Sequence, residues 1–250
     1  MKKWLVRIVI ALVALLVVGA VAVTLFLDRA VKHGVETVGP QLTKVPIKLD
    51  GVGLSLLTGS GSIKGLEVGN PEGYKAGNAI HLDRAALSLS PGSLFSDKIV
   101  IRSIRIEGPV INVEGSPSKN NLTQIRDNVQ AALGSVGSGG SGKDSTSASS
   151  GKKLQVDEFI LTGAKVNYTV PGVGLTVPIA VPDIKMTGLG TGPDGITAGD
   201  LTSRVLGQLT GDLVPLLTKA AGDAASGAVN KVTEEAGKAL KGVGDLFKKK

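Results

Sequence analysis

The chain has 250 residues, of which only 3% are aromatic and 35 are glycine, and it contains no cysteine. This composition predicts an aliphatic core with frequent turns, and it excludes disulfides and thiolate metal sites. The net charge of +7 is concentrated at the two ends, in Lys2, Lys3 and Arg7 and in the run Lys248–Lys250, so the chain between them is close to neutral. A basic face that binds nucleic acid is therefore not expected.

An uncharged run of twenty residues, Ile8–Leu27, follows the basic residues 1–7. A helix of this length rises about 30 Å, which matches the hydrocarbon core of a bilayer, and we predict a transmembrane anchor here. Because the positive charges precede the run, residues 1–7 are predicted to be a cytoplasmic tail and the remaining chain to lie across the membrane. The alternative is a signal peptide cleaved near Ala20-Val21-Ala22. The retained anchor is favoured because the apolar run continues to Leu27.

Residues 28–44 form a connector that is predicted to continue the helix through Val31, Val35 and Val38. A β unit over residues 45–133 follows, and one apolar rhythm recurs in it, with alternating positions, a skipped pair and further alternating positions. The rhythm occupies three segments: Ile47, Leu49, Val52, Leu54 and Leu56; Ile80, Leu82, Ala85, Leu87 and Leu89; and Ile99, Ile101, Ile104 and Ile106. A bulge at Arg102-Ser103 would place the four isoleucines on one face, and two short strands joined by a tight turn are the alternative.

The third of these segments recurs 55 residues further along the chain. Ile99, Ile101, Ile104, Ile106, Gly108, Ile111, Asn112 and Val113 align with Leu154, Val156, Phe159, Leu161, Gly163, Val166, Asn167 and Tyr168. A stacked array of similar β units explains the repeat. Chance similarity between two amphipathic hairpins is the alternative.

A short helix, a linker and a second β unit are predicted after the first copy. The helix is capped by Asn120 or Asn121, and its apolar positions are Leu122, Ile125, Val129 and Leu133, spaced three and four residues apart. Residues 134–153 are rich in glycine and serine and are predicted to be a flexible linker. The second β unit spans residues 154–199, and its prolines, Pro171, Pro178 and Pro182, place its middle part at a sheet edge.

Residues 200–250 are predicted to be an amphipathic helical tail, with Asp200 as its N-cap and a kink or division at Pro215. Its apolar stripe consists of Leu201, Val205, Leu209, Leu213, Leu216 and Leu217. The part that follows, to Lys250, is rich in alanine, glycine and lysine, and we expect it to be helical only on a partner or a lipid surface.

Chemical motifs are sparse in this sequence. The histidines, His33 and His81, have no neighbouring cluster of carboxylates and no second histidine near them in the sequence, and no metal site is predicted from ligand spacing. The glycine and lysine spacing of residues 137–143 imitates a phosphate-binding loop, but Asp144 stands where a Ser or Thr should follow. No nucleophile–base or acid–base pair can be nominated, so we predict no catalytic residues, no cofactor and no enzyme activity.

Residues 47–133 resemble the AsmA-like family of bacterial envelope proteins, which are distantly similar to TamB and chorein-type lipid-bridge proteins. The resemblance is carried by Ile47-Lys-Leu-Asp-Gly-Val-Gly-Leu54, by Leu66-Glu-Val-Gly-Asn-Pro-Glu-Gly-Tyr74, and by the run from Ile99 to Val113 with Gly108-Pro109. Asn121-Leu122 leading into a helix completes the pattern.

The resemblance implies a mainly β fold, in which a curved antiparallel sheet has an apolar concave face and is joined to an N-terminal transmembrane helix and C-terminal helices. It also implies an inner-membrane protein whose bulk is periplasmic and whose groove binds phospholipid acyl chains. The candidate lipid-facing residues are Ile99, Ile101, Ile104, Ile106, Ile111 and Val113. About ten strands would span only about 50 Å, which is too short to cross an envelope alone.

Two functions follow from the resemblance. The first is binding or helping to transfer phospholipid for outer-membrane maintenance. The second is a non-enzymatic scaffold or assembly factor, whose sheet is sealed by its own C-terminal helix and whose partner is another envelope protein. An open or a covered concave face distinguishes the two.

Overall fold

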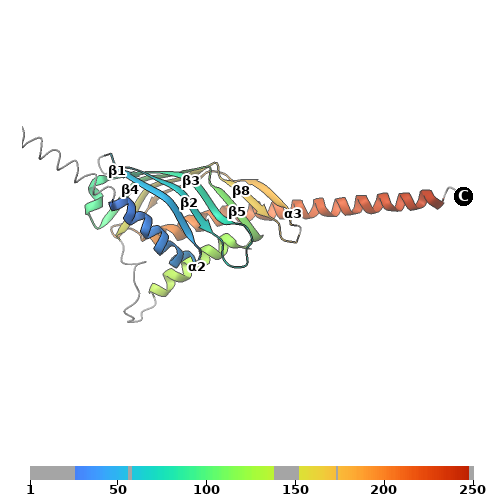
Figure 1. Ribbon diagram of the computed structural model, residues 1–250, viewed down its shortest axis with the longest axis horizontal. Coiled ribbons are helices and arrows are strands. Elements are labelled where there is room, and N and C mark those ends of the chain that lie inside the picture. The colour runs from blue at the N-terminus through green and yellow to red at the C-terminus, as the bar shows by residue number, and fades with distance from the viewer. Residues whose placement is uncertain (1–25, 56–57, 138–151, 173, 248–250) are drawn as a thin grey trace, which may run out of the picture.

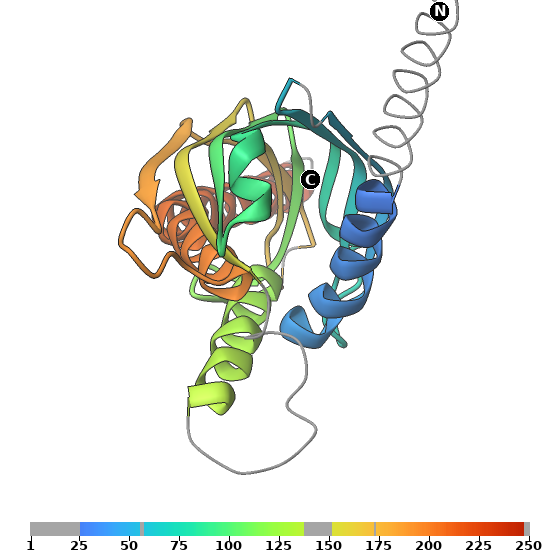
Figure 2. The same cartoon turned by 90° about the vertical axis from the view of Figure 1, so that its left-hand side faces the viewer.

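The computed structural model describes residues 26–55, 58–137, 152–172 and 174–247. Ten strands form one curved sheet, and three helices lie on the same side of it (Figure 1). Seen along the long axis of the molecule, the sheet arches over these helices, so its concave face is the face that they contact (Figure 2). The fold is therefore mixed α/β and not mainly β.

The strands and helices are defined as follows. The first six strands are β1 (Ile47–Ser55), β2 (Ser60–Gly69), β3 (Asn78–Leu89), β4 (Lys98–Glu107), β5 (Val110–Ser116) and β6 (Lys119–Asn120). The last four strands are β7 (Lys153–Thr162), β8 (Lys165–Thr169), β9 (Thr176–Ala180) and β10 (Ile184–Leu189). The helices are residues 26–43, the short 3-10 helix η1 (Pro91–Phe95), α2 (Asn121–Gly137) and α3 (Ala198–Phe247).

The sheet is mixed, which corrects the predicted antiparallel arrangement. β1, β2 and β3 form an antiparallel meander, and the other edge of β3 is shared by β5 and β4. β7 then pairs with β4, and β8 with β5, in parallel. The connection from β5 to β7 contains α2, and a connection of that length can return the chain to the end of the sheet from which it started, as parallel strands require.

The repeat at an offset of 55 residues is a physical pairing. Every register partner of β4 in β7, from Lys98↔Lys153 to Glu107↔Thr162, is separated by 55 residues, and the same holds for β5 and β8. Gly108 and Gly163 occupy the junctions between the strands, and both have a positive φ. The two copies therefore lie side by side in register.

At the skipped positions of the sequence, the ladder of paired residues between neighbouring strands is interrupted. The ladder passes from Leu49↔Leu66 directly to Gly51↔Lys64, and from Leu66↔Leu82 to Lys64↔Arg84. In β4, Ser88 pairs with Ser103 and Leu89 with Ile101, so Arg102 is the extra residue of a bulge. β4 is thus one strand with a bulge, as the first of the two sequence interpretations predicted, and the isoleucines on either side of the bulge share a face.

The edges of the sheet bear out the proline argument. β9, which contains Pro178, pairs with β8 alone among the described strands, and β10 lies at the edge beyond β7. The opposite edge, β1, is lined by helix 26–43, which continues the connector as predicted. The Asp28 and Glu36 carboxylates accept hydrogen bonds from the Leu54 and Leu49 amides at 2.8 and 3.0 Å, so side chains satisfy donors of an edge strand.

Both predicted helices form, with changes at their starts. Asn120 caps α2, because its Oδ1 accepts from the Thr123 amide at 3.0 Å while Thr123 Oγ1 accepts from the Asn120 amide at 2.8 Å. Thr197, not Asp200, caps α3, and the Asp200 carboxylate accepts from the Thr197 amide at 3.1 Å. α3 also continues through Pro215 undivided. Pro215 and Gly211, whose carbonyl loses its helical donor, are both exposed, so water can satisfy that carbonyl.

None of the helices within the described residues is long and apolar enough to cross a bilayer. The predicted anchor, Ile8–Leu27, and most of the predicted linker, residues 134–153, lie outside the described residues. The anchor, the linker and the domain boundaries therefore stay predictions.

Candidate functional site

Apolar side chains form continuous rows across the concave face. The distal row consists of the register partners Ile47, Val68, Ile80, Ile111, Val166 and Ile179. The middle row consists of Val52, Ile63, Ala85, Ile106, Leu161 and Ile184. The proximal row consists of Leu54, Gly61, Leu87, Ile104, Phe159 and Met186. Because register partners point to the same face, the rows make this face aliphatic from edge to edge.

Each row crosses six strands and not ten. β4 and β5 follow one another along one line of the sheet, β7 and β8 along the next, and β10 and β9 along the edge. The two-residue strand β6 pairs only with the end of β5, so the long strands fill six positions across. Five spacings of about 4.8 Å give a width of about 24 Å. This width is half of the span expected from the number of strands, and it strengthens the argument against a complete bridge between membranes.

The two ends of the sheet differ in what lies there. We call the proximal end the one where helix 26–43 begins, since Asp28 contacts Leu54 near the end of β1. The start of β4 and η1 also lie there, because β1 and β4 run in opposite directions through the meander. The distal end carries the end of β8, and α3 extends past it (Figure 1).

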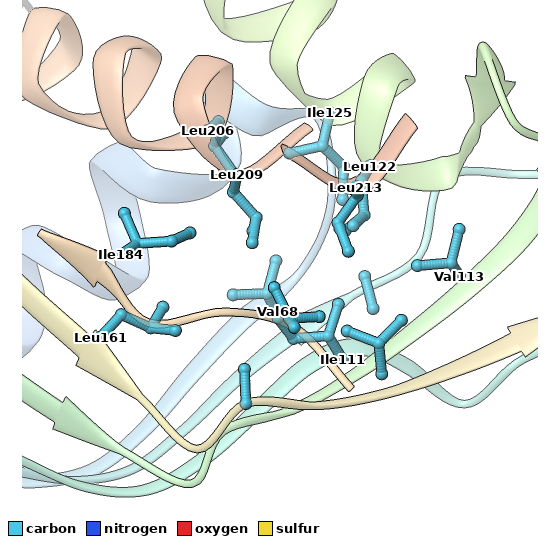
Figure 3. Packing of buried hydrophobic residues seen from close by; sticks show 14 of the residues in the cluster. Val68, Ile111, Val113, Leu122, Ile125, Leu161, Ile184, Leu206, Leu209 and Leu213 are labelled. Atoms are coloured by element: carbon cyan, nitrogen blue, oxygen red, sulfur yellow. The ribbon is translucent and has the colours of Figure 1, made fainter. Parts of the chain in front are cut away.

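The helices cover the concave face unevenly. Leu206, Leu209, Leu213 and Leu217 of α3 are buried in one cluster with Phe159, Leu161 and Ile184 of the sheet. Figure 3 shows Leu209 and Leu213 pointing toward the strands that carry Leu161 and Ile111. In the same rows, Val52, Leu54, Ile63 and Leu87 are only half-buried. Cover is therefore most complete over β7 and Ile184 of β10, and it is partial over β1, β2 and Leu87 of β3.

The six candidate lipid-facing residues fall into two groups. Ile111 and Val113 are each 1% exposed in the cluster that contains Leu122 and Ile125 of α2. Ile101, Ile104 and Ile106 are half-buried and pack against that cluster, and Ile99 is half-buried at the start of β4. Arg105 and Glu107 are exposed. The structure thus brings the four isoleucines of β4 together at the boundary between the covered and the partly covered half.

An asparagine cluster, which the sequence analysis did not find, fixes the distal end. The Asn121 side chain donates to Asn70 Oδ1 at 2.6 Å and to the Asn112 carbonyl at 2.8 Å, and it accepts from the Glu114 amide at 3.1 Å. The side-chain amide of Asn167 donates to Asn112 Oδ1 at 3.0 Å. The paired asparagines at offset 55 and the Asn70-Pro71 turn were the available signal. The cluster ties the loop after β2 to both copies of the repeat.

The remaining polar groups offer little for chemistry. A cleft of about 250 Å³ beside this loop is lined by both polar and apolar groups, including Lys48, Glu67 and Tyr74. Burial raises the pKa of Tyr74, with the Glu114 charge adding to the shift. His81 lies on the convex face, 3.1 Å from Asp83 and 3.7 Å from Glu67. Among the described residues no group of three side chains could hold a metal ion.

Electrostatics on the convex face are those of a solvated surface. Glu158 contacts Lys185 at 2.8 Å and Arg105 at 3.2 Å. The hydrogen bond from Lys185 is the main reason that the pKa of Glu158 lies below its usual value. These pairs are exposed and link β4, β7 and β10 across the polar side of the sheet.

The fold and this face define a class of protein, namely a curved sheet with an apolar concave face that helices partly cover. The family comparison agrees with this class, since the AsmA family model matches residues 1–178. The chain belongs to the AsmA family, whose members are cell-envelope proteins and are generally not enzymes. Comparisons with curated proteins and with solved structures gave no match.

Proposed function

We propose that this protein binds phospholipid acyl chains along the partly covered half of its concave face and so supports outer-membrane maintenance. In this proposal it is a single-pass inner-membrane protein, anchored by Ile8–Leu27, with its N-terminus in the cytoplasm and its sheet in the periplasm. It needs no cofactor and catalyses no reaction.

The observation that supports the proposal is the gradient of burial along the rows. In the middle row, Val52 and Ile63 are half-buried, whereas Leu161 and Ile184 are 6% and 5% exposed. For every Å² of apolar surface that these half-buried side chains leave in water, about 25 cal/mol of burial free energy is not gained. A lipid tail laid across this half would recover that free energy without displacing α3. The chain also arrives from the predicted anchor at the proximal end of this half.

Because the sheet is only about 24 Å wide, the proposed function is the binding of single lipid molecules. The residues proposed to contact the tails are Val52, Leu54, Ile63, Leu87, Ile99, Ile101, Ile104 and Ile106. Ile111 and Val113 lie under the helices, so they would contact lipid only after α2 moves.

Site-specific photo-crosslinking in cells tests this function. A photoreactive residue at Leu87 or Ile104 should capture phospholipid, because both side chains lie on the concave face. The matched controls are Ala86 and Arg105, which are register partners on the convex face and are both exposed. Equal lipid capture on the two faces, or no capture at Leu87 and Ile104 in a folded protein, would contradict lipid binding.

A second candidate, the scaffold, rests on a different observation. Leu206, Leu209, Leu213 and Leu217 seal the β7–β10 half of the face, and α3 continues beyond the sheet. A sealed half needs no lipid, and a protruding helix offers a surface for another envelope protein. Capture of protein and not of lipid at Leu87 would favour the scaffold.

A further inference from the structure

We propose that η1 is a membrane-docking knob, in which Phe95 inserts into the lipid interface of the bilayer that holds the anchor. This docking goes beyond lipid binding in the concave face, although it relies on the anchored topology of the proposed function. The occupant is the bilayer surface itself, at the boundary between headgroups and acyl chains.

The first argument is exposure. Phe95 is 87% exposed, the highest value among the large apolar side chains of the described residues. All five residues of η1 are described and none is buried. A single exposed apolar residue is ordinary on a protein surface. Phe95 is assigned a role because of the hydrogen bonds that hold η1 and because of its position in the molecule.

The second argument is rigidity, because hydrogen bonds hold η1 on both sides. Ser93 Oγ donates to the Ser90 carbonyl at 2.6 Å and accepts from the Val100 amide at 2.9 Å. Ser96 Oγ lies 2.8 and 2.9 Å from the Ser93 and Lys98 carbonyls, and its single proton is shared between these two acceptors. These bonds fix a short helix whose aromatic side chain contributes nothing to the core. Because the backbone of η1 is already fixed, insertion of Phe95 loses little backbone conformational entropy.

The third argument is position. Phe95 lies between the end of β3 and the start of β4, at the proximal end of the sheet. Helix 26–43 begins at the same end, and its first described residue, Phe26, is 71% exposed. If the anchor ends at Leu27, the membrane surface lies beside this end. Aromatic rings favour the interface between headgroups and hydrocarbon.

Charge around the knob is compatible with headgroups. Lys152 Nζ donates to the Leu94 carbonyl, which ties the start of the second β unit to η1. Lys98 Nζ donates to the Gly192 carbonyl at 3.1 Å, and Asp97 lies between Phe95 and Lys98 in sequence. The neighbouring charges are therefore mixed, so the aromatic ring and not a basic patch carries the proposal.

The structure supplies a matched control at the other end of the sheet. Leu175 follows β8 at the distal end and is 53% exposed, so it is also a large apolar side chain in water. Two points of contact, the anchor and the knob, would hold the proximal end of the sheet against the bilayer. The anchor alone would leave the sheet free to tilt on helix 26–43.

Single-cysteine variants of the full-length protein test the knob, since the chain has no cysteine of its own. Phe95→Cys, Leu175→Cys and Phe26→Cys are labelled with a polarity-sensitive fluorophore and reconstituted in vesicles of phosphatidylethanolamine and phosphatidylglycerol. We expect blue-shifted emission and quenching by spin-labelled lipid at positions 95 and 26, and water-like emission at position 175.

The outcomes separate the knob from the other proposals. Lipid contact at position 26 with water-like emission at position 95 would overturn the knob and leave the anchor standing. The same result is expected if a protein partner is the true occupant of η1, because the vesicles contain lipid alone. Water-like emission at all three positions would overturn both the knob and the anchor. Lipid capture at Leu87 is measured independently, so lipid binding in the concave face can fail while the knob holds.

Discussion

At the scale of single residues, Gly65 and Asp50 show how the sheet turns without exposing its apolar face. Gly65 has a φ of +58°, and a Cβ at this position would lie 2.0 Å from Asp50 Oδ2. Both residues occupy the step between Leu49↔Leu66 and Gly51↔Lys64. Leu66 and Ile63 are three positions apart, so regular alternation would place them on opposite faces. Glycine at position 65 permits the left-handed backbone that keeps both on one face.

The first prediction concerns this glycine. Gly65→Ala should lower the free energy of unfolding by about 1–3 kcal/mol, because it forces an alanine into a positive φ and against Asp50. Gly51→Ala is the control, since a Cβ there meets nothing within 4 Å. Urea denaturation of both purified variants, followed by circular dichroism, measures the difference. Equal stability of the two variants would show that the backbone at Gly65 is not strained by a side chain.

A second residue-scale prediction concerns Asn121, which is fully buried and donates two hydrogen bonds to oxygen atoms. Asn121→Asp keeps the shape but turns the donor into a carboxylate oxygen facing two acceptors. The free energy of unfolding should fall by about 3–5 kcal/mol, as for an uncompensated buried charge. Gln124→Glu makes the same change at an exposed position of α2 and should be nearly neutral. A small effect at Asn121 would mean that the cluster can rearrange.

At the scale of elements, caps and edges decide how the helices attach. Thr197 and Asp200 form a reciprocal pair at the start of α3, and Asp28, Lys32 and Glu36, four residues apart, line the free edge of β1. The i, i+4 spacing was visible in the sequence, but on a helix it usually indicates a solvated face. Nothing in the chain states that a strand edge lies opposite, so tertiary structure alone gives these side chains their role.

The third prediction uses the Asp200 carboxylate, which pairs with the capping residue Thr197. Its pKa lies below the usual value, chiefly because the Thr197 side chain donates to the carboxylate at 2.7 Å. A depressed pKa means that the stabilisation is complete above the unfolded value of 3.8 and is lost as pH falls through the folded pKa. Asp200→Asn should therefore cost about 0.5–2 kcal/mol at neutral pH. The difference from the unsubstituted chain should shrink as pH falls below 3.8, which thermal unfolding at several pH values measures. A constant difference at every pH would rule out the charge as its source.

At the scale of the whole molecule, the sequence predicted the parts better than their arrangement. The β4 bulge, the helix with Leu122, Ile125 and Val129, and the edge position of Pro178 follow from local patterns, and the structure confirms each of them. Strand direction does not follow from such patterns, because alternation is the same in parallel and antiparallel sheets. The width of the sheet was overestimated because local patterns also do not show which strands lie end to end along one line of the sheet.

The candidate site was predictable only in outline. The alternation of Ile99 to Ile106 indicates an apolar face, and the leucines of residues 201–217 indicate an apolar helix, but neither pattern states that one packs on the other. Whether the isoleucine face is covered by this helix, by lipid or by water depends on contacts between residues that are far apart in the sequence. The structure shows that α3 covers one half of the face and leaves the β1–β3 half partly covered. This uneven cover makes the fold compatible with both proposed functions, lipid binding and scaffolding.

The last prediction separates the two parts of α3 by truncation. Ala220, Ala221 and Ala224 still pack against the core, and the helix continues to Phe247 beyond the sheet (Figure 1). A chain that ends at Gly227 should therefore keep its free energy of unfolding and its lipid capture at Leu87. A chain that ends at Asp212 loses Leu213 and Leu217, each 1% exposed, and should lose at least about 4 kcal/mol.

Cells that carry the Gly227 truncation then test what the protruding helix does. Normal outer-membrane integrity with the truncated chain would assign function to the sheet and its lipid. A defect despite unchanged stability and lipid capture would assign it to a partner bound by the protruding helix, as the scaffold requires. If the Gly227 truncation itself unfolds, α3 is held to the molecule by more than the residues up to Ala224, and the division of the helix into a sealing and a protruding part is wrong.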